Sequence, residues 1–245
     1  MPVFGVVREL WDRIGGTQPV PSVWVIAVSG TIAVLIVLDA RLWRLARNSI
    51  TIAHEGGHAL VSVLSGRRLD GIRLHADTSG VTYSHGKRTG PAVVLTSAAG
   101  YVTPSLLGAG AAWLLAAHHV TAMLWLLLAL LAATFLAIRN AYGVVAVLVT
   151  TGAVLAVSWF AAAAIQAAFG YAAAWFLLLG GIRAVVELQS QRRRSRRHRQ
   201  VGTSDADQLG RLTGVPGGIW VTFFVLVSVA ALVLGMRLLI PGLLH

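Results

Sequence analysis

The sequence predicts an all-α polytopic membrane protein with about seven membrane helices and one small β-hairpin. Of its 245 residues, 56% are hydrophobic and only 12% are charged, and its mean hydropathy is +0.75. This composition is far too apolar for a soluble domain of this length. Most of the apolar residues fall into long runs, and about 20 such residues span a bilayer as a helix. The chain is therefore expected to be an integral membrane protein.

The first 21 residues (1–21) predict a short amphipathic helix at the membrane interface. Apolar residues recur at helical spacing between Val3 and Ile14, with charged residues between them, before two glycines and two prolines. Acidic residues interrupt the segment and no apolar core with a small-residue cleavage site follows promptly, so it is not a signal peptide. Residues 22–245 are expected to form a single membrane domain.

Six apolar runs and one helix with polar residues make up the seven predicted spans. The helix with polar residues covers residues 49–66, where Ser49 is the expected N-cap and Gly66 the residue after the C-cap. The first apolar run is barely long enough to cross a bilayer. The six apolar runs cover residues 23–38, 92–117, 120–138, 143–165, 168–186 and 219–240.

A β-hairpin is predicted at about residues 69–88, directly after the helix over residues 49–66. Alternating residues at 71–76 and 81–84 flank the turn-forming tetrapeptide at 77–80. The hairpin contains His75, Asp77 and His85, which could bind a metal ion in principle. The preferred interpretation is that they are solvated polar residues, with Asp77 opening the turn.

The helix over residues 49–66 carries the pattern H-E-x-x-H, formed by His54, Glu55 and His58. On a helix, both imidazoles lie on one face and can bind the same zinc ion, while Glu55 can act on a water molecule. The other residues of this helix are mostly small or apolar, and ionisable groups at membrane depth are costly, which favours a functional site. The alternative is a buried histidine pair that only packs against a neighbouring helix.

The formal net charge is +11, and much of the positive charge lies in the run Arg192–Arg199. This run belongs to a predicted loop at about residues 188–203, next to hydrophobic spans. Positive residues beside spans indicate the cytoplasmic side and contact anionic lipid headgroups. The bilayer therefore explains the charge, and nucleic acid is not an expected partner.

The distribution of Lys and Arg also predicts the orientation of the chain. With the N-terminal segment, the hairpin and the basic loop on one side, sixteen Lys and Arg residues lie on that side and four on the other. The positive-inside rule makes the side with sixteen cytoplasmic. The N-terminus is then cytoplasmic and the C-terminus, at His245, lies outside.

The order of these features resembles that of site-2-protease-like intramembrane zinc metalloproteases. The similarity covers residues 51–108: the H-E-x-x-H helix, the hairpin after it, and the stretch Ala98-Ala99-Gly100-Tyr101-Val102-Thr103-Pro104. The chain has no PDZ-type insertion and resembles a compact bacterial branch of the family. The resemblance implies a zinc endopeptidase of the bacterial plasma membrane that cleaves a transmembrane protein substrate.

The resemblance also implies the site residues. They are His54 and His58 as zinc ligands, Glu55 as the catalytic residue, and an aspartate from an L-D-G-type motif as the third ligand. The chain has no L-D-G, and the nearest match is Ser204-Asp205-Ala206, so Asp205 is the expected third ligand and Asp207 the alternative. Because there is no cysteine, a carboxylate is the natural third ligand beside two imidazoles. Without a ligand role, Ser204 would cap a short helix with both aspartates in its first turn.

Two other functions remain open at the level of the sequence. A catalytically silent membrane scaffold could keep the protease fold and bind partners without cutting them, and the absent L-D-G supports it. A zinc transporter is the weaker interpretation, because no other span carries a ladder of acidic or histidine residues.

Overall fold

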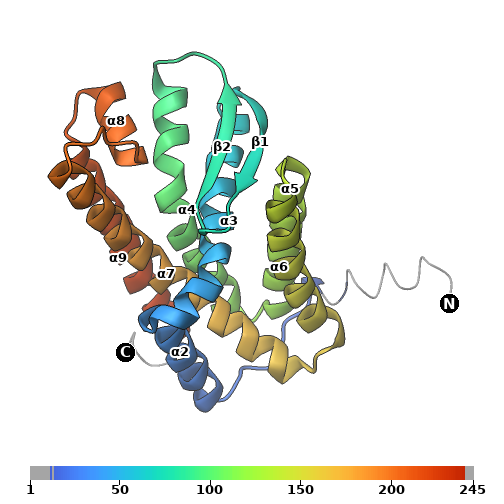
Figure 1. Ribbon diagram of the computed structural model, residues 1–245. Helices are drawn as coiled ribbons and strands as arrows, with labels where there is room; N and C mark the ends of the chain where they lie inside the picture. Colours follow the sequence, from blue (N-terminus) through green and yellow to red (C-terminus); the bar gives the residue numbers. More distant parts are fainter. Residues whose placement is uncertain (1–11, 13, 241–245) are drawn as a thin grey trace.

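The computed structural model describes residue 12 and residues 14–240, and it shows a helical bundle with a hairpin packed against it (Figure 1). The mostly helical architecture with one small antiparallel hairpin is as predicted. The predicted interfacial helix over residues 1–21 lies mostly outside the described residues. The elements are α2 (Val23–Leu38), α3 (Ala40–Leu64), β1 (Arg68–Leu74), β2 (Gly80–His85), α4 (Pro91–Ala116), α5 (Val120–Ala137), α6 (Ala141–Phe160), α7 (Ala163–Arg197), α8 (Asp205–Thr213) and α9 (Gly217–Leu239).

The number of membrane spans differs from the predicted seven. Five described helices are long and apolar enough to cross a membrane, namely α4, α5, α6, α7 and α9. The helices α2 and α3 meet the same criterion only as a pair, and they are bent by 100° at their junction. The described residues thus give five spans, or six if the bent pair crosses once, because the 16 residues of α2 are too few for a span of their own.

The junction between α2 and α3 is set by Asp39. Its carboxylate accepts hydrogen bonds from the backbone N–H groups of Arg41 (2.9 Å) and Leu42 (2.8 Å) and so caps α3. The helix that carries the H-E-x-x-H pattern therefore begins at Ala40, and the expectation that Ser49 caps it was wrong. Arg47 also lies on this helix.

The hairpin has one covered edge and one free edge. The strands β1 and β2 pair with Leu74 opposite Gly80, and residues 75–79 form the turn. On the outer edge of β1, the N–H of Arg139 donates to the carbonyl of Ile72 at 2.9 Å, and the Asn140 side chain bonds both the N–H and the carbonyl of Leu74. The connection between α5 and α6 therefore covers β1, and only β2 offers its backbone to a further strand.

The long helix α4 lies at the centre of the bundle and packs against α3, α7, α8 and α9. Its contact with α3 is close because Gly57 has no side chain: a Cβ there would lie 2.6 Å from the Cβ of Thr103. Small residues at such crossings let helix backbones approach one another inside a membrane. This close approach places α4 directly beside the histidines of α3.

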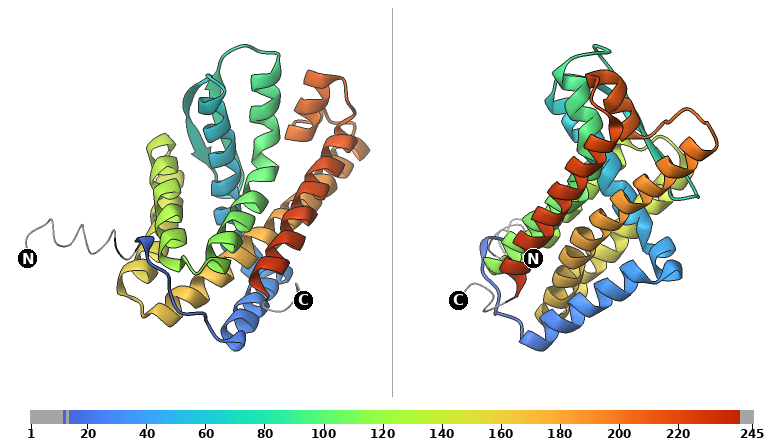
Figure 2. Two further views of the ribbon diagram at one scale, coloured as in Figure 1. Left: turned by 180° about the vertical axis from the view of Figure 1, so that it is seen from behind. Right: turned by 90° about the vertical axis from the view of Figure 1, so that its left-hand side faces the viewer.

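The predicted basic loop at residues 188–203 is mostly helical. The helix α7 has 35 residues and continues through Arg197, so most of the basic run forms the C-terminal end of a helix. Cationic side chains at this position interact favourably with the helix dipole. Only the segment after Arg197 connects α7 to α8, as the views in Figure 2 show.

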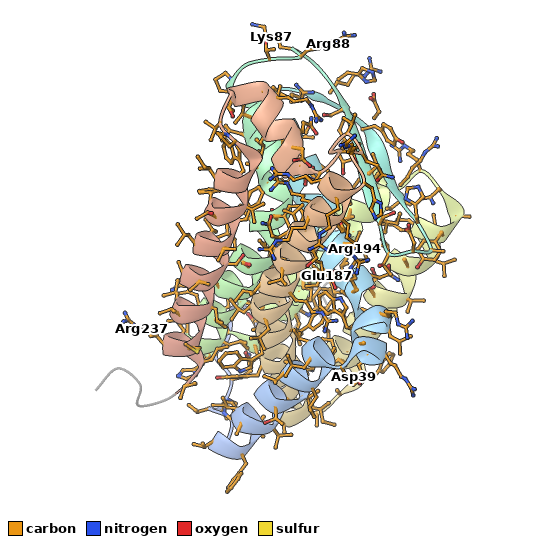
Figure 3. All side chains as sticks on the ribbon, turned by 60° about the vertical axis from the view of Figure 1, so that its left-hand side comes forward. Asp39, Lys87, Arg88, Glu187, Arg194 and Arg237 are labelled. Carbon is orange, nitrogen blue, oxygen red and sulfur yellow. The ribbon has the colours of Figure 1, made fainter. Side chains whose placement is uncertain are left out.

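The N-terminal segment that the structure describes lies at the end of the bundle opposite the hairpin. The N–H of Gln18 donates to the carbonyl of His118 at 2.8 Å, and its side-chain oxygen accepts from the N–H of Thr121 at 3.1 Å. The turn between α4 and α5 that holds these residues is at the far end of α4 from the hairpin loop. In Figure 3, Lys87 and Arg88 mark that loop, and Arg237 lies far from it. Residues 14–21 and the hairpin therefore lie at opposite ends of the bundle, and not at the same end as the predicted orientation required.

This placement changes the expected orientation of the N-terminal segment. The hairpin end still carries most of the positive charge and is expected to be cytoplasmic, whereas residues 16–22 are now expected outside. Cysteine at Thr17 should react with an impermeant thiol reagent in intact cells, and cysteine at Gln200 should react only after lysis. The chain has no native cysteine, so the wild-type protein is the blank. Protection at both positions would restore the original orientation of the N-terminal segment.

Candidate metal centre

The helical turn between His54 and His58 places their imidazoles side by side on α3. Their Nε2 atoms are 3.1 Å apart, and the ring planes are nearly perpendicular. The Nδ1 of His58 lies 2.6 Å from the carbonyl oxygen of Thr96 in α4. A carbonyl can only accept, so Nδ1 carries the proton and the Nε2 lone pair is left to bind a metal ion.

The third member of the group comes from α8. The Oδ2 atom of Asp205 is 3.2 Å from the Nε2 atoms of both His54 and His58. Two atoms that bind one tetrahedral zinc ion at about 2.0–2.1 Å are about 3.3 Å apart. His54, His58 and Asp205 therefore form a group that could hold a metal ion.

A glycine of α4, Gly100, borders this group and leaves room for an ion. Gly100 faces the two imidazoles, and a Cβ at this position would lie 2.6 Å from the Nε2 atom of His54. Any side chain here would therefore overlap the metal-ligand atoms. The neighbouring Tyr101 ring packs edge-on against His54, with ring centroids 4.5 Å apart, and tilts over Phe224. The geometry of the donor atoms and the space beside them fit a zinc ion.

Glu55 is buried under the hairpin, on the same cleft as the two histidines. Only 4% of the surface of this residue is exposed, and its Oε2 atom accepts a hydrogen bond of 2.7 Å from the hydroxyl of Thr82 in β2. Gly80 lets β2 approach, because a Cβ there would lie 2.6 Å from the Cγ of Glu55. The cleft has a volume of about 590 Å³ and is lined by β2, α3, α4, α7 and α8.

Asp207 points away from the histidines and anchors α8 to α7. Its Oδ1 atom accepts from Nε (3.0 Å) and Nη2 (2.9 Å) of the buried Arg192, and its Oδ2 atom accepts from the Ser204 hydroxyl at 2.6 Å. Burial alone would raise the pKa of Asp207, but the hydrogen bonds from Arg192 and Ser204 lower it below its ordinary value. The side chain of Asp207 is thus fully used in holding the helix.

Asp205 faces the two histidines, although it is only two residues from Asp207. Burial alone would raise the pKa of its carboxyl, but attraction to the imidazoles of His58 and His54 outweighs burial and holds the pKa well below its usual range. Ser204 caps α8, as the sequence indicated, and its hydroxyl accepts from the N–H of Asp207 at 3.3 Å. Ser204 therefore caps the helix, while the next residue, Asp205, belongs to the metal-ligand group.

The hairpin residues that the sequence offered as possible ligands, His75, Asp77 and His85, lie outside the metal-ligand group. Asp77 accepts hydrogen bonds from the N–H (3.0 Å) and hydroxyl (2.7 Å) of Ser79, which lowers its pKa, so it forms the turn as expected. His75 pairs with the Ser79 hydroxyl, and His85 pairs with Asp70. Among the described residues, none of these three belongs to a group able to hold a metal ion.

Sequence reasoning did not identify several residues around the centre. The hydroxyl of Thr82 orients Glu55, and the carbonyl of Thr96 orients His58. The guanidinium of Arg192 holds α8 through its hydrogen bonds to Asp207. A threonine in a strand or helix gives no pattern that indicates such a role. Tyr101 could have been suspected, because it directly follows Gly100 in the stretch that resembles the protease family.

The sequence matches the model of one protein family, described as Peptidase M50B-like, over residues 27–235. The chain belongs to this family. The match covers α3, the hairpin and α8, so it includes every element of the metal-ligand group, and it confirms the resemblance to site-2 proteases. Peptidases of the M50 family are zinc metalloproteases, and no PDZ domain was matched. Comparisons with curated proteins and with solved structures found no match.

The different surroundings of the two aspartates give a test in this M50B-like chain. Asp205→Ala removes one of the three candidate ligands and should abolish stoichiometric zinc binding. Asp207→Ala frees α8 from Arg192 and should weaken zinc affinity by about 10–100-fold, as is typical for residues that support a ligand. Chelator competition with metal analysis measures both, and Asp77→Ala, in the exposed turn, is the control. Equal zinc loss in the Asp205 and Asp77 variants would contradict the assignment.

Proposed function

We propose that the chain is an intramembrane zinc endopeptidase that cleaves a transmembrane protein substrate. The observation that carries the proposal is the meeting of His54, His58 and Asp205 beside Glu55, in a polar cleft of an otherwise apolar bundle. Membership in the M50 family supports metalloprotease activity. The three side chains would be the zinc ligands, the number usual in catalytic zinc sites.

The chain's own residues account for the proton transfers of hydrolysis. Zinc held by His54, His58 and Asp205 would polarise the scissile carbonyl and lower the pKa of a water molecule. Glu55 takes the proton from the attacking water and then gives it to the leaving amine. The Thr82 hydroxyl holds one oxygen of Glu55 in place, so the carboxylate faces the cleft in one orientation.

Substrate binding is expected at the free edge of β2. A substrate helix must unwind before cleavage, because its amides are hydrogen-bonded internally. The hairpin has two edges that could hold the unwound segment, residues 72–76 and 81–84. The connection between α5 and α6 occupies the first, while residues 81–84 line the cleft beside Glu55. Strand addition at residues 81–84 would therefore bring the peptide to the metal-ligand group.

Water for the reaction can come from the end of the bundle that carries the hairpin. The cleft is lined at its α7 and α8 side by polar residues that include Gln191, Ser195 and Gln208. The positive charge at this end favours a cytoplasmic location. The proposed setting is the bacterial plasma membrane, with fragment release following cleavage of a transmembrane partner.

The catalytically silent scaffold gains no support from the geometry. This alternative was based on the absence of an L-D-G motif. However, Oδ2 of Asp205 lies 3.2 Å from Nε2 of both histidines, close to the separation of two ligand atoms on one zinc ion. A scaffold would also have no need for a buried carboxylate oriented by Thr82.

Glu55→Gln tests the protease directly. The variant should fold and retain zinc, because Glu55 is not a ligand, yet cleavage should fall by about two to four orders of magnitude without the base. The assay follows products from a pool of synthetic transmembrane peptides in detergent by mass spectrometry. Asp39→Asn is the control, since asparagine caps helices as well as aspartate does. Cleavage by the Glu55 variant within a few-fold of wild type would contradict the protease assignment, and a wild-type protein that cleaves nothing would favour the scaffold.

Thr82→Val tests whether the hairpin positions the base. The variant keeps the shape of the side chain but loses the hydrogen bond to Oε2, and a hydrogen bond to a charged group contributes about 1.5–3 kcal/mol. We expect kcat to fall about tenfold or more, with KM nearly unchanged. Thr82→Ser should restore most of the rate. A change in KM alone would mean that Thr82 contacts the substrate and does not position Glu55.

A further inference from the structure

A second cavity lies on the opposite side of α3 from the metal-ligand group. It has a volume of about 480 Å³ and runs between the α5–α6 pair and the helices α3, α4 and α7. Ile52, Ala53 and Gly56 of α3 face this cavity, whereas His54 and Glu55 face the cleft. Figure 1 shows the α5–α6 pair standing beside the rest of the bundle. We call this cavity the apolar groove.

The apolar groove is too small for a substrate helix. A helix is about 10 Å across and rises 5.4 Å per turn, so one turn fills roughly 420 Å³. A transmembrane segment of about 20 residues would fill roughly 2,300 Å³ at this rate, which exceeds the volume of the groove. A substrate helix could lie against the opening of the groove but could not enter it.

An unwound peptide does not match the groove either, because the lining offers almost no hydrogen bonds. Its only polar side chains belong to one serine and three threonines. The hydroxyls of Thr103, Thr134 and Thr150 each donate to a carbonyl of their own helix at 2.8–2.9 Å. Peptide N–H and carbonyl groups would stay unpaired there at a cost of several kcal/mol each. A hydrocarbon chain carries no such groups.

A positive charge lies at the end of the groove near the hairpin. Ala137 and Leu69 line this end, and Arg139 follows Ala137 at the end of α5. Its exposed guanidinium bonds only the backbone carbonyls of Leu136 (2.7 Å) and Ile138 (2.9 Å) and forms no ion pair with any described residue. The remaining N–H groups of the guanidinium can bind a phosphate.

We propose that the apolar groove binds one acyl chain of an anionic phospholipid whose headgroup phosphate contacts Arg139. The chain fills the space between the α5–α6 pair and α3, and the phosphate lies at the level where the positive end of the bundle meets the headgroups. The lipid is thus a bound component of the fold, distinct from the lipids that surround the molecule. This inference is independent of the proposed protease activity, because it concerns the other side of α3.

Native mass spectrometry of the detergent-purified full chain with added phosphatidylglycerol or phosphatidylcholine tests the proposal. Wild type should retain one phosphatidylglycerol. Ala133→Phe places a large ring in the groove and should weaken binding by about tenfold or more, as expected if several methylenes are displaced. The matched control is Ala132→Phe on the neighbouring exposed position, which does not line the groove. If the Ala133 variant does not fold, Ala173→Leu narrows the groove from α7.

Arg139→Gln should lower phosphatidylglycerol binding by about tenfold, the loss expected for one charged hydrogen-bonded contact. Arg193→Gln, on the same positively charged end, should have no such effect. Equal lipid retention by the Ala133 and Ala132 variants would overturn the site. Equal binding of the two lipids by wild type would overturn the preference for an anionic lipid, and unchanged phosphatidylglycerol binding by the Arg139 variant would overturn the role of Arg139. Unchanged lipid binding with a raised KM for peptides in the Ala133 variant would assign the groove to the substrate instead.

Discussion

The central constraint on this molecule is that ionisable side chains must be partnered when they lie inside an apolar bundle. An unpaired buried carboxylate or imidazolium is very costly, and each such group near the centre has a partner. Glu55 bonds Thr82, His58 bonds Thr96, Asp205 faces both imidazoles, and Asp207 pairs with Arg192. The elements that carry these residues must therefore meet at one place, although they are far apart in the sequence.

A second polar cluster holds the hairpin over the centre and obeys the same constraint. Arg47 of α3 forms an ion pair of 3.0 Å with Glu187 of α7 and also bonds the side chain of Thr78 in the hairpin turn. The indole of Trp43 donates to Glu187 at 2.7 Å. These contacts tie the turn of the hairpin to two helices. The position of β2 over Glu55 is consequently fixed at the turn as well as along the strand.

The sequence was sufficient for the parts of the fold that depend on local patterns. Apolar runs predicted the helices, alternation predicted the hairpin, and the spacing of His54 and His58 predicted their common face. It was insufficient where tertiary contacts decide. The continuation of α7 to Arg197 and the position of Gln18 beside His118 depend on packing that no local pattern carries. Asp205 could be proposed only through a family resemblance, because the Arg192 contact that occupies Asp207 joins separate helices.

The helix α3 separates two spaces of opposite chemistry, and its sequence explains how. Polar residues at positions 54, 55 and 58 face the cleft, while the small residues at 53 and 56 face the apolar groove. A large side chain at 56 would approach Thr134, since a Cβ there already lies 3.3 Å from its hydroxyl oxygen. Small residues thus leave space on one side of the helix while the other side holds the metal-ligand atoms. A molecule bound in the apolar groove would pack against the side of α3 opposite the histidines. The rigidity of the two histidines therefore depends on packing on both sides of a single helix.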